Sequence, residues 1–208
     1  MRIGLASDSF GNLDALDRAL ELFARLPVER VFFLGGRWAD VDAVLARRRG
    51  RSKQGPVPQS DLEFLAAVEG ALGRTSAAED PLASRIVRVA SRACPEYAGA
   101  APKKIVDMVE GRICCLVHDK AELTRDDISN ASVLFHGNSG HAALVPIGPR
   151  IFVTPGHLRL PPPGGPPASF GVVELDAREI ALTVYSAEAA ELRRDRAALG
   201  AGSKLSVK

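Results

Sequence analysis

The chain opens with MRIGLASDSFGN, residues 1–12, and this stretch decides the fold. A short apolar run ends at Asp8, the chain turns at Gly11, and an amphipathic pattern begins at Asn12. This order predicts a buried strand, a loop and the N-terminus of a helix that Pro27 ends. Asp8 is therefore expected at the carboxyl end of a strand, the edge at which open α/β sheets bind ligands.

A second strand is predicted at residues 30–34, directly before Gly35 and Gly36, and a helix over residues 39–48. Strands that alternate with helices indicate parallel pairing. Because parallel strands end at the same edge of a sheet, the loop at Gly35 and Gly36 is expected beside Asp8.

Composition sets the class of protein. A chain of 208 residues with 46% apolar residues can bury a full core as one domain, and a net charge of +2 is too small to indicate a polyanionic partner. Cys94, Cys114 and Cys115 have no metal-type spacing, which favours a reduced cytoplasmic protein. The N-terminal residues contain no signal-peptide pattern, and no apolar run reaches the length of a membrane span, so no membrane association is expected.

The composition changes at residues 47–58, which are basic and rich in Gly and Pro, and a surface loop is predicted there. No aromatic residue is interleaved for base stacking, which argues against a nucleic-acid partner. A capping-box pattern at Ser60 then predicts a helix to Leu72 with Leu62 and Leu65 on its apolar face. This face is a candidate docking surface for a protein partner.

The opening residues resemble those of the calcineurin-like metallophosphoesterases, especially the small bacterial type. Residues 8–12 correspond to the family sequence Asp-x-His-Gly-Asn, and residues 34–36 correspond to Leu-Gly-Asp. Phe10 stands where the family has a metal-binding histidine. Gly36 stands where the family has the aspartate that bridges two metals.

Three later segments continue the resemblance. Residues 86–91 are similar to the family strand Val-Arg-Gly-Asn, with Ala90 in place of the ligand asparagine. The strand at residues 112–119 places His118 on a ligand histidine of the family. Residues 133–141 are similar to the stretch Gly-His-x-His, and both histidines are replaced there. Asn138 and Gly140 stand at these two positions, and His136 and His141 flank the motif one residue outside it.

The resemblance implies an α/β fold, a four-layer α/β/β/α sandwich of two mixed β-sheets. Residues 1–186 are expected to form one such domain with an insertion at about 47–80, and residues 187–208 a C-terminal helix and a flexible tail. The activity it implies is phosphate-ester hydrolysis by two divalent metals that bind the substrate and activate a water.

The ligand set argues against that activity. Only Asp8 and His118 keep ligand chemistry, and two ligands cannot hold two dications. Phe10 and Trp38 are expected to fill the space, and Arg37 to supply a counter-charge to Asp8. We therefore expect a catalytically degenerate protein that binds no cofactor and serves as a protein-binding or scaffold module. The retromer subunit that resembles these phosphoesterases is a precedent.

Two alternatives stay open. One is a rewired phosphoesterase with a single Mn, Fe, Zn or Ni ion on Asp8, His118 and Asn138, completed by His136 or His141. The other is a metal-free anion sensor in which Arg37 or Arg88 lies beside His118, since guanidinium groups suit phosphate geometry.

Overall fold

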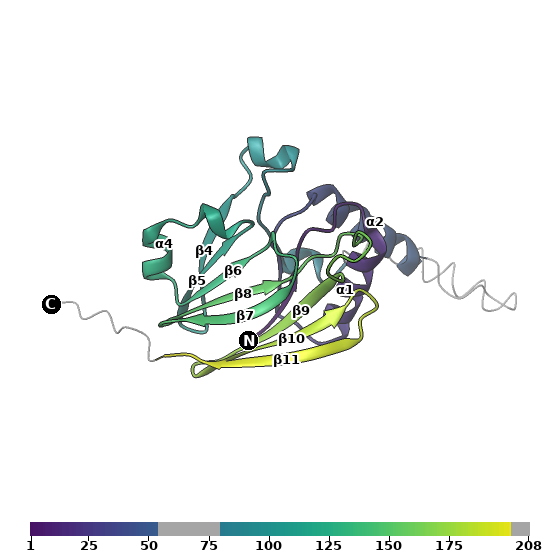
Figure 1. Ribbon diagram of the computed structural model, residues 1–208. Coiled ribbons are helices and arrows are strands. Elements are labelled where there is room, and N and C mark those ends of the chain that lie inside the picture. The colour runs from purple at the N-terminus through teal and green to yellow at the C-terminus, as the bar shows by residue number, and fades with distance from the viewer. Residues whose placement is uncertain (54–79, 201–208) are drawn as a thin grey trace, which may run out of the picture.

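The computed structural model describes residues 1–53 and 80–200, with the backbone only for residues 51–53. Two mixed β-sheets face each other (Figure 1). One sheet has six strands in the order β11-β10-β9-β1-β2-β3, and the other has five in the order β4-β5-β6-β8-β7. Both sheets combine parallel pairs with antiparallel hairpins.

The strands of the six-stranded sheet are β1 (Arg2–Ala6), β2 (Arg30–Phe33), β3 (Ile86–Arg88), β9 (Ser169–Leu175), β10 (Glu179–Ser186) and β11 (Glu191–Ala198). The strands of the five-stranded sheet are β4 (Lys104–Val109), β5 (Arg112–Val117), β6 (Val133–His136), β7 (Ala142–Ile147) and β8 (Arg150–Pro155). The α-helices are α1 (Leu13–Arg25), α2 (Trp38–Lys53) and α4 (Arg125–Asn130), and the 3₁₀ turns are η1 (Ala83–Arg85), η2 (Pro95–Ala98) and η3 (Lys120–Glu122).

The helices cover the two outer faces unequally. Helices α1 and α2 lie together on the six-stranded sheet, and their apolar faces pack on outward residues of β1, β2 and β9 (Figure 1). Among the described residues, the outer face of the five-stranded sheet carries the short α4 and η3, over a small cluster around Cys115 and Leu134. The four layers predicted from the sequence are therefore present, with one thin helical layer.

The main core lies between the sheets. Alternate residues of each strand point inward, as the period of a strand requires, and among them Phe32 and Phe135 meet edge to face with ring centroids 5.4 Å apart. The first helix begins where the sequence predicts, because the Asn12 side chain caps it by accepting from the Ala15 N–H. Its cap fixes the direction in which the loop after β1 enters α1.

Two predictions of local structure were wrong. Residues 191–198 form strand β11 rather than part of a C-terminal helix, because pairing along β10 outweighs the helix propensity of Ala, Glu and Arg. The loop predicted from residue 47 continues α2 as far as residue 53, where Arg48 ties the helix to Asp17 and Asp80.

The predicted helix at residues 60–72, with Leu62 and Leu65, lies outside the described residues. Among the helices that are described, none combines the length and the apolar character needed to cross a bilayer.

Candidate functional site

Five strand ends converge at one edge of the sandwich. The Asp8 N–H donates to Gly35 O at 3.0 Å, which joins the ends of β1 and β2. Gly137, after β6, packs so closely that a β-carbon there would lie 2.2 Å from Ser7 Oγ and 2.3 Å from Leu34 O. The Leu158 N–H, after β8, donates to Ser7 O at 2.9 Å. His118 follows β5, so the edge predicted to hold a ligand assembles from both sheets.

Asp8 is the centre of this edge. Its side chain is buried, and Oδ1 lies 2.9 Å from Nε2 of His118. Oδ2 accepts from the Asn138 N–H at 2.9 Å and from Ser7 Oγ at 3.0 Å. A carboxylate oxygen accepts, so this contact is a hydrogen bond when Nε2 of His118 carries the ring proton. Both carboxylate oxygens are thus satisfied by groups of the protein itself.

The loop after β1 is held in a conformation that few side chains adopt. Asp8 and Phe10 have φ angles of 54° and 41°, and Gly11 follows at 91°. Asp40 fixes this loop from α2, because its Oδ2 accepts from Ser9 Oγ and from the Gly11 N–H, each at 2.7 Å. Phe10 is half-buried and is not a member of the packed apolar clusters of the described chain.

The glycines after β2 allow the two sheets to approach. Gly35 has φ 120°, and a β-carbon there would lie 2.0 Å from Cδ2 of His118. Gly36 has φ 102°, and a β-carbon would lie 3.1 Å from the Ser9 nitrogen and 3.2 Å from the Asp8 α-carbon. The backbone at the former bridging position therefore lies against the loop of Asp8 and leaves little room for a side chain.

The opposite wall of the site is largely apolar. Ala90 is fully buried, and Trp38 packs on the helix-facing core while its Nε1–H donates to Val89 O at 3.3 Å. Cys94 is buried, its Sγ donates to Gly36 O, and burial raises the pKa of this thiol. These groups close the side on which the family resemblance places metal ligands.

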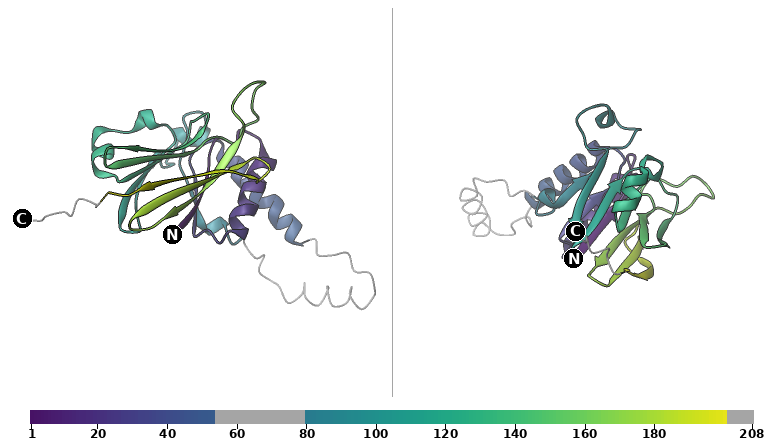
Figure 2. Two further views of the ribbon diagram at one scale, coloured as in Figure 1. Left: turned by 60° about the horizontal axis from the view of Figure 1, so that its bottom comes forward. Right: turned by 90° about the vertical axis from the view of Figure 1, so that its left-hand side faces the viewer.

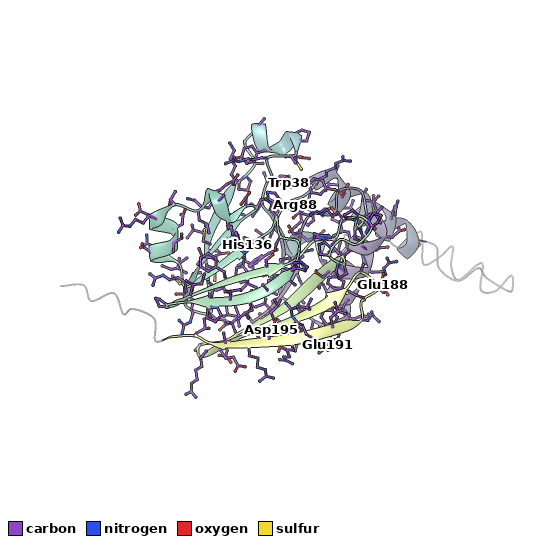
Figure 3. All side chains as sticks on the ribbon, in the orientation of Figure 1. Trp38, Arg88, His136, Glu188, Glu191 and Asp195 are labelled. Atoms are coloured by element: carbon purple, nitrogen blue, oxygen red, sulfur yellow. The ribbon has the colours of Figure 1, made fainter. Side chains whose placement is uncertain are left out.

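The two candidate anion-binding arginines differ in their contacts. Arg88 forms an ion pair with Asp42 at 2.7 Å, and its guanidinium lies 5.9 Å from the Trp38 ring centroid. Both Arg88 and Trp38 are labelled in Figure 3. Arg37 is exposed and forms no hydrogen bond or ion pair with Asp8. The counter-charge predicted from Arg37 is a wrong assignment, because the hydrogen bonds from His118, Ser7 and Asn138 occupy the carboxylate.

The remaining candidate ligands are dispersed. His136, labelled in Figure 3, is buried and its Nδ1 lies 2.9 Å from Gly137 O; burial lowers the pKa of its ring. His141 is exposed. The Asn138 side chain donates to Asp119 at 2.8 Å, and Gly140 lies against Pro166. The structure therefore brings Asp8, His118 and the Asn138 backbone together and leaves the two flanking histidines apart.

The sequence predictions missed two residues of this edge, Asp40 and His157. Asp40 stands in the first turn of α2, a position where acidic residues are common, and only the fold shows that it holds the β1 loop. His157 is 1% exposed, and neither ring nitrogen has a hydrogen-bond partner among the described residues. Burial and the nearby Arg159 lower the pKa of His157, which favours the neutral form of the ring.

A cavity of about 470 Å³ lies at the other end of β1. It is lined by residues of the β1 start, the α1–β2 turn and the β9–β10 hairpin, among them Arg2, Glu29 and Glu174. Arg2 and Glu174 are already paired at 2.7 Å. This cavity is separate from the edge that carries Asp8 and His118.

The residues at the edge do not fit the two-metal centre that the fold family implies. A cation between Asp8 and His118 would have to break their direct 2.9 Å contact and compete with the Ser7 and Asn138 donors. Across residues 1–53 and 80–200, no group of three or more His, Cys, Asp or Glu side chains is arranged to hold a metal ion.

Solved structures share this fold across nearly the whole chain. A Streptococcus pneumoniae protein described as a predicted phosphoesterase aligns over 95% of this chain and 97% of its own, with 16% identity and a TM-score of 0.60. The Escherichia coli phosphoesterase Yfce aligns over 94% and 98%, with 20% identity and a TM-score of 0.57. Vps29 of Chaetomium thermophilum aligns over 95% and 97%, with 14% identity and a TM-score of 0.57.

The sequence alone matches no protein-family model and no curated protein. The structural likeness agrees with the motif order found in the sequence, from Asp8 through His118 to Asn138. The chain thus has the fold of the calcineurin-like metallophosphoesterases.

Proposed function

We propose that this protein is a non-hydrolytic relative of the metallophosphoesterases that acts in the cytoplasm as a protein-binding or scaffold module. The observation that carries the proposal is the direct hydrogen bond between Asp8 and His118. A hydrolytic centre of this class keeps its carboxylates and imidazoles free to hold cations. Here the two residues that retain ligand chemistry bond to each other.

The surrounding replacements support the same proposal. Gly36 has no carboxylate to bridge two dications, and Ala90 has no ligand atom. Trp38 and Cys94 bond to backbone carbonyls at this wall. If the metal ligands had been replaced at random after function was lost, the side chains around them would not be expected to form such internal hydrogen bonds.

The solved relatives are consistent with a binding role. Vps29 of Chaetomium thermophilum has been crystallised with a cyclic peptide, over a match that covers 96% of this chain at 13% identity and a TM-score of 0.52. We infer that the present chain likewise presents its surface to a protein partner, and that it has no need of a metal to do so.

Metal content and hydrolysis together test the proposal. The purified full chain is incubated with Mn²⁺ or Zn²⁺, desalted, and measured for bound metal and for hydrolysis of an aryl phosphate monoester and diester. We expect no stoichiometric metal and no turnover above that of Asp8→Ala. Stoichiometric metal together with turnover that disappears in Asp8→Ala would overturn the proposal and favour the rewired phosphoesterase.

A further inference from the structure

The loop between β8 and β9 is anchored at its base and projects beyond it. Leu158 is fully buried; its N–H donates to Ser7 O at 2.9 Å and its carbonyl accepts from Asn12 Nδ2 at 2.8 Å. The Ser169 N–H donates to His157 O at 2.7 Å, which joins the two ends of the loop. Figure 2 shows the loop extending away from the two sheets in both views.

The projecting part has little conformational freedom. Its sequence is RLPPPGGPP, residues 159–167. Leu160, Pro161 and Pro162 each precede a proline, which excludes helical backbone and favours extended or polyproline II conformation. The Gly165 N–H donates to Pro162 O at 2.8 Å, and Gly164 has φ 70°, so the segment ends in a tight turn. The prolines therefore favour a short extended segment between the anchored base and the turn.

This segment presents an apolar surface to solvent. Leu160 is 76% exposed, more than any other large apolar residue of the described chain. Pro161, Pro162 and Pro163 are exposed beside it, and Arg159 is exposed at the start without an ion-pair partner among the described residues. A single exposed leucine is common in proteins, but here it begins a run of four apolar residues that contains no polar side chain.

Other exposed apolar residues do not indicate a partner in this way. Val106 and Met108 lie on edge strand β4, and the Met108 N–H donates to Asp107 Oδ1 at 2.7 Å, so an added strand would find that donor already used. Nothing about their surroundings selects one kind of occupant. The β8–β9 loop differs because its composition and charge define what it can bind.

We propose that residues 159–163 are a docking peptide for a polyproline-recognising protein module, one with an aromatic-lined groove and an acidic rim. Aromatic grooves bind polyproline II segments because the rings pack between prolines and the segment loses little entropy on binding. Leu160 and the prolines fill the groove, and Arg159 pairs with the acidic rim. The proposal rests on the proposed scaffold function and specifies the surface and the class of partner.

A panel of purified SH3, WW and EVH1 domains tests this directly against the immobilised full chain by biolayer interferometry. We expect at least one domain to bind, with affinity that falls about tenfold in Leu160→Ser, as for a buried apolar anchor. Arg159→Glu should weaken binding and reduce its salt dependence. Ile147→Ser is the matched control, because Ile147 is 58% exposed at the far end of β7, and it should bind as the unsubstituted chain does.

Absence of binding across the panel, or equal losses in Leu160→Ser and Ile147→Ser, would overturn the docking proposal. These outcomes are separate from the metal and hydrolysis test. A chain that neither hydrolyses phosphate esters nor binds the panel keeps its proposed scaffold role and loses this docking site.

Discussion

The loops after β1 and β8 lie at the same edge of the sandwich and are built in opposite ways. In the β1 loop the polar atoms turn inward, where Asp8 bonds to His118, Ser7 and Asn138, and Asp40 bonds to Ser9. In the β8 loop only the base is buried, and Leu160 with its neighbouring prolines faces solvent. The first loop is closed around groups that in related folds hold metals, and the second is free to contact another molecule.

This contrast teaches that a buried polar edge need not leave its groups unpaired. The buried donors and acceptors of the β1 loop satisfy one another, and these hydrogen bonds contribute to stability. The exposed β8 loop can instead contact a partner, because substitutions in it cost little stability. The two loops should accordingly respond to substitution in different ways.

Gly35→Ala should have the largest effect. The β-carbon would lie 2.0 Å from the His118 ring, at a φ angle of 120° that favours glycine. Strain and overpacking together should lower the free energy of unfolding by about 3–5 kcal/mol, measured by urea denaturation. Gly11→Ala is the control, because its φ is 91° but no atom lies within 4 Å of the new β-carbon. A loss of equal size in both variants would show that contact with His118 contributes nothing.

Asp8→Ala should have the second-largest effect and lower the free energy of unfolding by about 2–4 kcal/mol. The ring N–H of His118, the Ser7 hydroxyl and the Asn138 N–H would all lose their acceptor. Asp8→Asn should cost less, since an amide oxygen can still accept and Asn tolerates the φ of 54°. Replacing a metal ligand that is kept for function at the expense of stability would instead raise the free energy of unfolding of the metal-free chain. If Asp8→Ala stabilised the metal-free chain, the closed-site interpretation would be wrong.

His157→Leu should have a smaller effect that depends on pH. Burial keeps the pKa of His157 below its usual 6.5 in the folded chain, so the unfolded chain binds the proton first as pH falls. Stability is then full above about pH 6.5 and decreases below it. Leucine does not titrate, so the decrease in stability at low pH disappears, and it has no buried ring nitrogens without a partner. The variant should therefore be about 1 kcal/mol more stable than the unsubstituted chain at pH 5.5.

The measurement is urea denaturation of both chains between pH 5 and 8. Some acid sensitivity should persist in His157→Leu, because burial also lowers the pKa of His136. An unchanged pH profile would mean that the His157 ring finds a partner for its proton when the protein is acidified.

Leu160→Ser should have the smallest effect on folding. An exposed loop residue without buried contacts changes the free energy of unfolding by less than about 0.5 kcal/mol, even though the same change is expected to weaken partner binding. Thermal or urea unfolding checks this directly. A loss of 2 kcal/mol or more, the order expected for a core residue, would show that Leu160 packs inward and that the contrast between the two loops is false.

The sequence predicted which strand ends and which helix cap form this edge, because these features follow local sequence patterns. The Asp8 strand end, the Asn12 cap and His118 each follow a short motif, and the structure brings all three to one place. The partner of Asp8 was wrongly predicted as Arg37, because the close approach at Gly35 that brings the His118 ring to Asp8 depends on how the two sheets face each other. His157 and strand β11 depend on contacts distant in sequence, which periodicity does not encode.

The backbone at Gly36 has an evolutionary consequence. Its left-handed conformation, with a β-carbon site 3.1 Å from the Ser9 nitrogen, would oppose a carboxylate introduced by Gly36→Asp unless the neighbouring loop moved at the same time. A metal-bridging carboxylate at this position would therefore require coordinated changes in the loop that carries Asp8 and Ser9.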